Sequence, residues 1–325
     1  MKLAMVYFFE EHDKKIALAK QLGVTHAVTN ASLDGQTVQD SCRPWEYAAL
    51  IQKVKSYEDK GIKVSVIEGP SPLNKAKLGI DGKDEEIEVF CEFLKTLAKI
   101  GIHTVCYNWM PTIGWFRTNP SVETRGGAYV TGYCDALMKD APPTDAGYVS
   151  AEKLWENLEY FLKAVLPVAE KSGVRLALHP DDPPVPSLRG ISRILISADA
   201  LQCAVDLVPS NNNGITMCQG SFAAMGENIP KVIEKFGKQK KIFFAHFRDI
   251  KGSATDFVET FHDDGQTDMY ACMKKYREIG YDGFMRPDHV PVMAGEENIN
   301  PGYGVLGNLF AIGYMKGLIE AAWHD

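Results

Sequence analysis

The 325-residue sequence lacks several features that mark particular classes of protein. No apolar run approaches the roughly 18 residues of a membrane-spanning helix, so no membrane contact is expected. Lysine and arginine are outnumbered by aspartate and glutamate, 35 to 42, and form no long basic run. This balance does not indicate nucleic acid binding. No low-complexity linker or shift in composition divides the chain, which indicates one domain over residues 1–325.

Paired cysteine spacing is also missing. The seven cysteines are an odd number, whereas disulfide frameworks are typical of short secreted chains with an even number. The apolar stretch near the N-terminus is short and is followed by the charged residue Glu10, and it shows no cleavable signal-peptide pattern. We therefore expect reduced thiols and a cytoplasmic protein.

A repeated pattern of short apolar runs, turns and long amphipathic stretches fills the chain. The runs are too short for helices and apolar on both faces, as buried parallel strands are. Glycine follows most of the amphipathic stretches, where a helix end needs a left-handed residue. The eight predicted strands cover residues 3–9, 26–32, 63–69, 104–109, 175–180, 214–220, 241–249 and 283–289.

Eight strands that alternate with helices predict an α/β fold, the (β/α)8 TIM barrel. The clearest predicted helices cover residues 44–61, 84–101, 150–173 and 305–322. A doubly wound open sheet is the alternative architecture. Eight units of similar length favour closure into a barrel.

One connection is much longer than the others. Residues 111–148 follow the fourth predicted strand and are rich in Gly and Thr. A connection this long is usually a functional lid or a disordered insert. Trp115 and Arg117 can cover an anionic ligand, and Gly126 and Gly127 permit hinge motion. We expect a loop that acts as an active-site lid, with a disordered insert as the alternative.

Four consecutive predicted strands end with residues that can bind a metal ion. His179 ends the fifth strand, Cys218 the sixth, His246 the seventh and Asp288 the eighth. In a parallel barrel these ends meet on one face, where barrel active sites lie. Taken singly, each residue can be a core histidine, a packed thiol or a turn residue. Because two imidazoles, a thiol and a carboxylate coincide at one level, a divalent metal site is favoured.

Several motifs resemble the signature blocks of the mannonate dehydratase family. They occur in the family's order from about the third strand to the C-terminus, and HPDDPP together with MRPDH is the specific part. The blocks are CYNWMP (Cys106–Pro111), LALHPDDPP (Leu176–Pro184), TMCQGS (Thr216–Ser221), AHFRD (Ala245–Asp249), DGQTDMY (Asp264–Tyr270), MRPDH (Met285–His289) and NPGY (Asn300–Tyr303).

This resemblance implies a barrel of the xylose-isomerase-like group. It also implies a hydro-lyase that uses Mn²⁺ to dehydrate D-mannonate to 2-keto-3-deoxy-D-gluconate in glucuronate catabolism. The family's acid–base residues correspond to His289 and Tyr303, and its metal ligands correspond to the four residues at the strand ends. A thiolate ligand would on softness alone favour Zn²⁺ or Fe²⁺, and Fe²⁺ or Co²⁺ are the expected substitutes for Mn²⁺.

Two departures from the family pattern border the mouth of the barrel. The family usually opens with a strand carrying Arg-Trp-Tyr-Gly, whereas this chain reads MVYFFEE at Met5–Glu11. The family's segment after the fourth strand is often much longer than residues 111–148. Both departures bear on the substrate, so the alternative function is a metal-dependent sugar or sugar-acid isomerase or epimerase.

The expected partner is a small-molecule sugar acid, and we expect a homo-oligomer. Arg248 and Arg286 lie next to predicted ligands and either hold the substrate carboxylate or form salt bridges in the barrel wall. Asn108, in the CYNWMP block, is the third predicted substrate-binding residue. Asp181 and Asp182 either orient a ligand histidine or cap the next helix.

Overall fold

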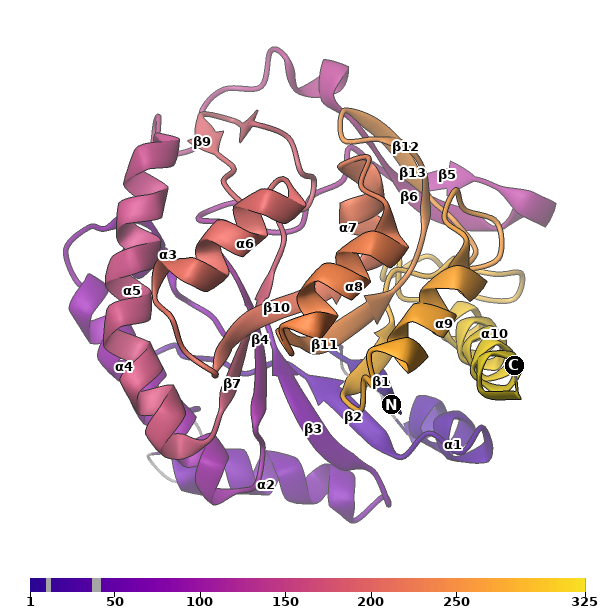
Figure 1. Cartoon of the computed structure of the whole chain (residues 1–325), viewed down its shortest axis with the longest axis horizontal. Coiled ribbons are helices and arrows are strands. Elements are labelled where there is room, and N and C mark those ends of the chain that lie inside the picture. The colour runs from indigo at the N-terminus through magenta and orange to yellow at the C-terminus, as the bar shows by residue number, and fades with distance from the viewer. Residues whose placement is uncertain (10–12, 37–41, 325) are drawn as a thin grey trace.

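The structure, a computed structural model, describes residues 1–9, 13–36 and 42–324. Glu10 and Glu11, which end the opening segment compared with the family above, lie outside the described residues. Eight parallel strands close into a barrel, and helices surround it (Figure 1). The predicted fold class is confirmed.

The barrel strands follow the predicted apolar runs. Closure is made by β1, which pairs in parallel with both the second and the last barrel strand, as in the Leu3–Met285 and Ala4–His26 pairs. In barrel order the strands are β1 (Lys2–Tyr7), β14 (Phe284–Pro287), β11 (Ile242–Phe247), β10 (Asn213–Cys218), β7 (Arg175–His179), β4 (Thr104–Asn108), β3 (Lys63–Glu68) and β2 (His26–Thr29).

Ten α-helices lie in the described part of the chain, and none of them is both long and apolar enough to cross a membrane. Some follow barrel strands and others lie in the connections at the ends of the barrel (Figure 1). They are α1 (Asp13–Gln21), α2 (Tyr47–Glu58), α3 (Asn74–Leu78), α4 (Lys83–Lys99), α5 (Ala151–Ser172), α6 (Ala198–Leu207), α7 (Gln219–Ala224), α8 (Ile229–Lys238), α9 (Met269–Glu278) and α10 (Val305–His324).

The longest helix, α5, shows why these segments are helical. The Ser150 side chain accepts a hydrogen bond from the backbone N–H of Lys153 and so caps the first turn. Gly173 ends the helix in the left-handed conformation with φ of 65°. The face between these ends buries Leu158 and Phe161 against the barrel, and each such side chain contributes about 1.5–3 kcal/mol.

Apolar side chains fill the barrel interior as well as the layer between strands and helices. The hydroxyl of Thr216, inside the barrel, has a hydrogen-bond partner, because it donates to the carbonyl oxygen of Ala177 at 3.1 Å. A packed interior leaves the carboxyl ends of the strands as the place for a site. The interior cluster consists of Ala4, Val6, Val28, Val66, Cys106, Ala177, Phe243 and Phe244.

The segment 111–148 is not the irregular loop that its composition indicates. It forms two antiparallel strands, β5 (Asn119–Glu123) and β6 (Tyr129–Cys134). Strand β6 also pairs with β13 (Asp256–Glu259), which pairs with β12 (Ile250–Ser253), so four strands form a second sheet beside the barrel (Figure 1). Because β5 is exposed along most of its length, no alternation of apolar and polar residues marks it in the sequence. A small third sheet joins β8 (Ser187–Leu188) to β9 (Ile191–Ser192).

Candidate functional site

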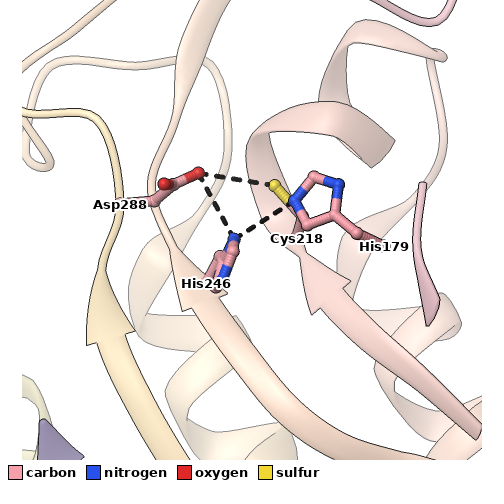
Figure 2. A group of neighbouring side chains, drawn as sticks. All are labelled: His179, Cys218, His246 and Asp288. Atoms are coloured by element: carbon pink, nitrogen blue, oxygen red, sulfur yellow. Dashed lines mark hydrogen bonds and ion pairs between the residues drawn. The ribbon is translucent and has the colours of Figure 1, made fainter. Parts of the chain in front are cut away.

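The four predicted metal ligands meet at the carboxyl ends of the strands (Figure 2). Nε2 of His179 lies 3.2 Å from Nδ1 of His246, which lies 3.5 Å from Oδ2 of Asp288. Sγ of Cys218 lies 3.7 Å from the same carboxylate oxygen. All four ligand atoms lie within 4.8 Å of one another.

Strand register brings the four side chains to one level. Cys218 is the last residue of β10 and pairs with His246 on β11. His179 is the last residue of β7, and Asp288 follows β14 directly. Since all four strands run in parallel, their ends converge, as the sequence analysis predicts.

The separations suit a single metal ion. Bonds of about 2.0–2.3 Å to nitrogen, oxygen and sulfur place neighbouring ligand atoms about 3.2–3.8 Å apart. The three distances between neighbouring ligand atoms, 3.2, 3.5 and 3.7 Å, lie in that range. The geometry therefore fits the metal group that the sequence predicts.

The thiol and the carboxyl are held in the forms that bind metals. Burial opposes ionisation of Cys218, but Arg248 and His179 lower the pKa of this thiol well below its usual value. Burial likewise opposes ionisation of Asp288, but His289, Arg286 and other cations lower the pKa of this carboxyl. Metal ligation requires the thiolate and the carboxylate.

A carboxylate lies near each ring nitrogen of His246. Although burial and Arg286 oppose it, Glu68 and Asp288 raise the pKa of His246 well above its usual value. Nε2 of His246 lies 3.4 Å from Oε1 of Glu68, on the side away from the other ligands. A site that stabilises a proton on a buried imidazole in this way is suited to a divalent cation in place of the proton.

Both predicted arginines lie in buried ion pairs. Arg248 contacts Asp288 through Nε at 3.0 Å and Asp182 through Nη2 at 2.6 Å. Arg286 contacts Asp288 through Nη1 at 2.9 Å and Glu68 through Nη2 at 2.6 Å. These contacts are the barrel-wall salt bridges that the sequence offers as the alternative to substrate binding. They orient the candidate ligand Asp288. Substrate binding by either arginine stays a prediction.

A cavity of about 100 Å³ adjoins the ligands. Both predicted acid–base residues line it, as do Asn108 and Arg286. The imidazole of His289 faces the phenol of Tyr303 with ring centroids 5.5 Å apart. The structure thus brings together the predicted ligands, the proton-transfer residues and all three predicted substrate-binding residues, although Arg248 does not line the cavity.

A second cavity, of about 810 Å³, lies outside the first and shares Tyr303 with it. Phe8 and Phe9, which belong to the segment that departs from the family's opening motif, line this outer cavity. The rings of Phe8 and Phe9 lie 5.8 and 5.4 Å from that of Tyr303. The departure in the opening strand therefore lies beside a predicted acid–base residue.

Two charged residues of the site were not predicted, and a third, Arg117, was predicted only as a lid residue that covers the ligand. Glu68, at the end of β3, contacts His246 and Arg286. The carboxylate of Glu259, on β13, lies 3.0 Å from Nδ1 of His289, which also lies 2.7 Å from Nη1 of Arg248. Arg117, from the segment 111–148, contacts Glu259 with a side chain that is only 2% exposed.

The acidic pair after β7 acts differently from either predicted role. Asp182 accepts hydrogen bonds from both terminal nitrogens of Arg117 and from Arg248. Asp181 accepts a hydrogen bond from the backbone N–H of Leu195 at 2.9 Å. Asp182 therefore anchors the segment 111–148 to the barrel, rather than orienting a ligand histidine.

The sequence matches the family described as D-mannonate dehydratase (UxuA) over residues 1–146 and 144–324. The chain belongs to the D-mannonate dehydratase family. It is 34% identical to mannonate dehydratase of Thermotoga neapolitana over 357 residues, which cover 99% of this chain and 98% of the relative. It is 32% identical to mannonate dehydratase 2 of Halalkalibacterium halodurans over 352 residues, which cover 99% of each chain. The resemblance read from the motifs is confirmed.

Solved structures agree with this family. The crystal structure of mannonate dehydratase from Streptococcus suis serotype 2 matches with a TM-score of 0.90 and 30% identity, over 100% of this chain and 94% of that chain. A D-tagatose 3-epimerase-like protein matches with a TM-score of 0.63 at 17% identity, over 100% of this chain and 99% of that chain. At that identity the second match shows the barrel fold alone. The chain is therefore an enzyme of the hydro-lyase class, as the mannonate dehydratase family is.

Proposed function

We propose that this protein removes water from D-mannonate to give 2-keto-3-deoxy-D-gluconate, with a divalent metal ion held by His179, Cys218, His246 and Asp288. The observation that carries the proposal is the convergence of these four ligand atoms within 4.8 Å, beside a cavity lined by His289 and Tyr303. Family membership supplies the substrate. We propose Mn²⁺ as the ion, with Fe²⁺ or Co²⁺ as substitutes.

The reaction breaks the C2–H and C3–O bonds of the sugar acid. The C2 proton is weakly acidic because the neighbouring carboxylate already carries a negative charge. When bound, the metal ion supplies Lewis-acid stabilisation for the negative charge that develops on the substrate's carboxylate and C2 oxygens. The remaining requirements are a base for the C2 proton and an acid for the departing C3 hydroxyl.

His289 is placed to take the C2 proton. Its Nδ1 lies 3.0 Å from the carboxylate of Glu259 and 2.7 Å from Nη1 of Arg248. We assign the tautomer in which Nδ1–H donates to Glu259, which leaves Nε2 bare as the basic atom. The carboxylate also stabilises the imidazolium that forms when Nε2 takes the proton.

Tyr303 is placed to give a proton to the C3 hydroxyl. Burial, with Asp288 as the next cause, raises the pKa of the Tyr303 phenol above its usual value. The phenol therefore carries its proton at neutral pH and acts as the donor. The C3 oxygen then leaves as water, and the enol that remains tautomerises to the 2-keto product.

Trp115 supplies an apolar wall beside these two groups. Its ring centroid lies 4.6 Å from that of His289 and 6.5 Å from that of Tyr303. A ring in this position excludes water from the carbanion side of the reaction. We propose on this ground that residues 111–148 act as an active-site lid.

The test is incubation of the metal-loaded protein with D-mannonate, followed by an assay for a 2-keto-3-deoxy acid. Dehydration predicts the 2-keto-3-deoxy product together with loss of the C3 hydroxyl. An isomerase or epimerase would retain that hydroxyl, and a product of unchanged composition would replace this proposal by the alternative. Activity lost on chelation and restored by Mn²⁺ checks the metal.

Two further expectations accompany the proposal. We expect the enzyme to act in the cytoplasm and to form a homo-oligomer. Cell fractionation checks the first, and light scattering of the purified protein checks the second. A small-molecule sugar acid is the partner that the cavity and the family support.

A further inference from the structure

A buried lysine lies behind the cavity, at a place that the mechanism above does not use. Lys77 belongs to the short helix α3 and is 7% exposed. Its ammonium group donates to Oδ1 of Asn108 at 2.8 Å and lies 3.5 Å from the carbonyl of Met110. Burial lowers the pKa of Lys77 to about 8, so the group still carries its charge at neutral pH.

The backbone around Lys77 is held by long-range contacts. Nδ2 of Asn157, on α5, donates to the carbonyl of Lys77 at 2.9 Å. The N–H of Thr112, after β4, donates to Oδ1 of Asn74 at 3.0 Å. At Gly79, which ends the helix with φ of 67°, a Cβ would lie 2.3 Å from Oδ1 of Asn157. Helix α3 is therefore packed closely against α5, and the backbone of Lys77 is held in one position relative to Asn108.

The contacts of Asn108 determine which way its amide points. Oδ1 accepts from the Lys77 ammonium at 2.8 Å and from the backbone N–H of Met110 at 3.1 Å. Both partners can only donate, so the atom they meet must be the carbonyl oxygen. Its two lone pairs are then used, and the NH2 group is the part of the amide left for the cavity that Asn108 lines.

Asn108 lines the same cavity as the candidate ligands His179, His246 and Asp288. Asn108 pairs in register with the ligand His179 across β4 and β7. In the proposed reaction the oxygens that gain negative charge are those nearest the ligands. A donor at this place meets an acceptor whose charge increases in the transition state.

We propose that Lys77 is a positioning residue that turns the Asn108 amide so that its NH2 group donates to a negatively charged oxygen of the bound sugar acid. The inference rests on the proposed function, and it names the part of the substrate that Asn108 meets. Lys77 acts in two ways through one hydrogen bond. It fixes the orientation of the amide, and its positive charge polarises the amide so that the N–H bonds become stronger donors.

The first test compares two lysines of the same helix. Loss of one preorganised donor to a developing oxyanion costs about 10²–10³ in kcat, and we expect Lys77→Met to lower kcat by at least about tenfold as the donor is misaligned. Metal content should stay stoichiometric. Lys75→Met, at an exposed position two residues away, should leave kcat unchanged. An unchanged kcat in Lys77→Met would overturn the inference.

The second test is a double-mutant cycle with Asn108→Ala. If Lys77 acts through Asn108, the double variant should be no slower than Asn108→Ala alone, because Asn108→Ala already removes the amide that Lys77 orients. A lysine with only a structural role would lower kcat or the melting temperature equally in both backgrounds. Additive losses would therefore overturn the inference.

The third variant tests the orientation itself and does not depend on Lys77→Met being folded. Asn108→Asp keeps an oxygen for Lys77 and Met110 but replaces the NH2 group by a second acceptor. We expect a loss of kcat as large as in Asn108→Ala. If the amide instead presented its oxygen to the substrate, Asn108→Asp would retain most of the activity, and the inference would be wrong.

Failure of the inference and failure of the proposed function are distinguishable. Absence of a 2-keto-3-deoxy product from the wild-type protein refutes the function without any variant. The same cycle can be measured on binding, by calorimetric titration of the metal-loaded protein with D-gluconate, which differs from D-mannonate only at C2. Non-additive losses of affinity for Lys77→Met and Asn108→Ala support the inference, and additive or absent losses refute it.

Discussion

The carboxylate of Glu259 lies 3.0 Å from Nδ1 of His289, although the two residues are 30 positions apart and only His289 follows a barrel strand. Glu259 belongs to β13, in the sheet that the segment 111–148 completes. The same carboxylate oxygen accepts from Arg117 at 2.5 Å and from Arg248. The second sheet is thus joined to the proposed base through a single buried carboxylate.

Glu259→Gln tests this connection. The variant removes the charge that stabilises a protonated His289, so we expect kcat to fall by about 10²-fold, the low end for acid–base catalysis. Metal content should be unchanged, because Glu259 contacts none of the four ligands directly. Breaking a buried ion pair costs about 3–5 kcal/mol, so the melting temperature should fall as well, and kinetics should be measured well below it.

A matched control is Glu123→Gln, the same change at an exposed position of β5 in the same sheet. It should alter neither kcat nor the melting temperature appreciably. Normal turnover in Glu259→Gln would show that His289 does not depend on this carboxylate.

Substitution of two buried cysteines, Cys218 and Cys106, tests which of them is a metal ligand and which is a packed thiol. Cys218→Ser should lower metal content and activity together, since the serine hydroxyl is not ionised as the thiol is beside Arg248. In Cys106, by contrast, burial with Glu68 as the next cause raises the pKa of the thiol, and its side chain belongs to the barrel interior. Cys106→Ser should therefore keep the metal. Elemental analysis of both purified variants decides the assignment, and full occupancy in Cys218→Ser would contradict it.

His289 adjoins the ligand Asp288 in sequence but is expected to move a proton rather than bind the ion. Its Nε2 lies 3.8 Å from Oδ1 of Asp288, whereas the four-ligand cluster uses Oδ2. His289→Asn should retain stoichiometric metal and lose at least about 100-fold in kcat. Loss of the metal would instead place His289 among the ligands.

The barrel and the convergence of the four candidate ligands could be predicted from the sequence because both follow a local rule. Strands such as KVSVIEG are short and mostly apolar in their central part, and a residue at the carboxyl end of a parallel barrel strand must lie on one face of the barrel. His179, Cys218 and His246 obey that rule. Glu68 obeys it too, at the end of β3, and the same reasoning extended to that strand would have found it.

Glu259 and Arg117 could not be found in this way. They meet across 142 positions, through a sheet made from two connections whose strands show no strong apolar alternation. A buried charged residue looks like a solvated one in the sequence, because burial depends on partners that the tertiary fold supplies. The lid segment was predicted as a loop for the same reason.

The segment 111–148 is anchored at its start and contacts the site through Trp115, which limits how it can act as a lid. Arg117 is 2% exposed and pairs with Asp182 and Glu259, so the stem of the segment should stay in place. Trp115 is 38% exposed and its ring lies 4.6 Å from that of His289. The movable part of a lid would therefore be the tryptophan side chain and its neighbours, rather than the whole sheet.

Trp115→Ala should raise KM for D-mannonate and lower kcat by about tenfold or more, because water reaches the proton-transfer groups when the ring is removed. Metal content should be normal, since Trp115 contacts no ligand of the cluster. Leu137→Ala is the control, because Leu137 belongs to the same segment and is 69% exposed; its kinetics should match the wild type. Limited proteolysis adds an independent measurement, in which Mn²⁺ and D-mannonate together should protect the segment in the wild type but protect it less in Trp115→Ala. Kinetics and protection that are the same in both proteins would mean that the segment only supports the fold.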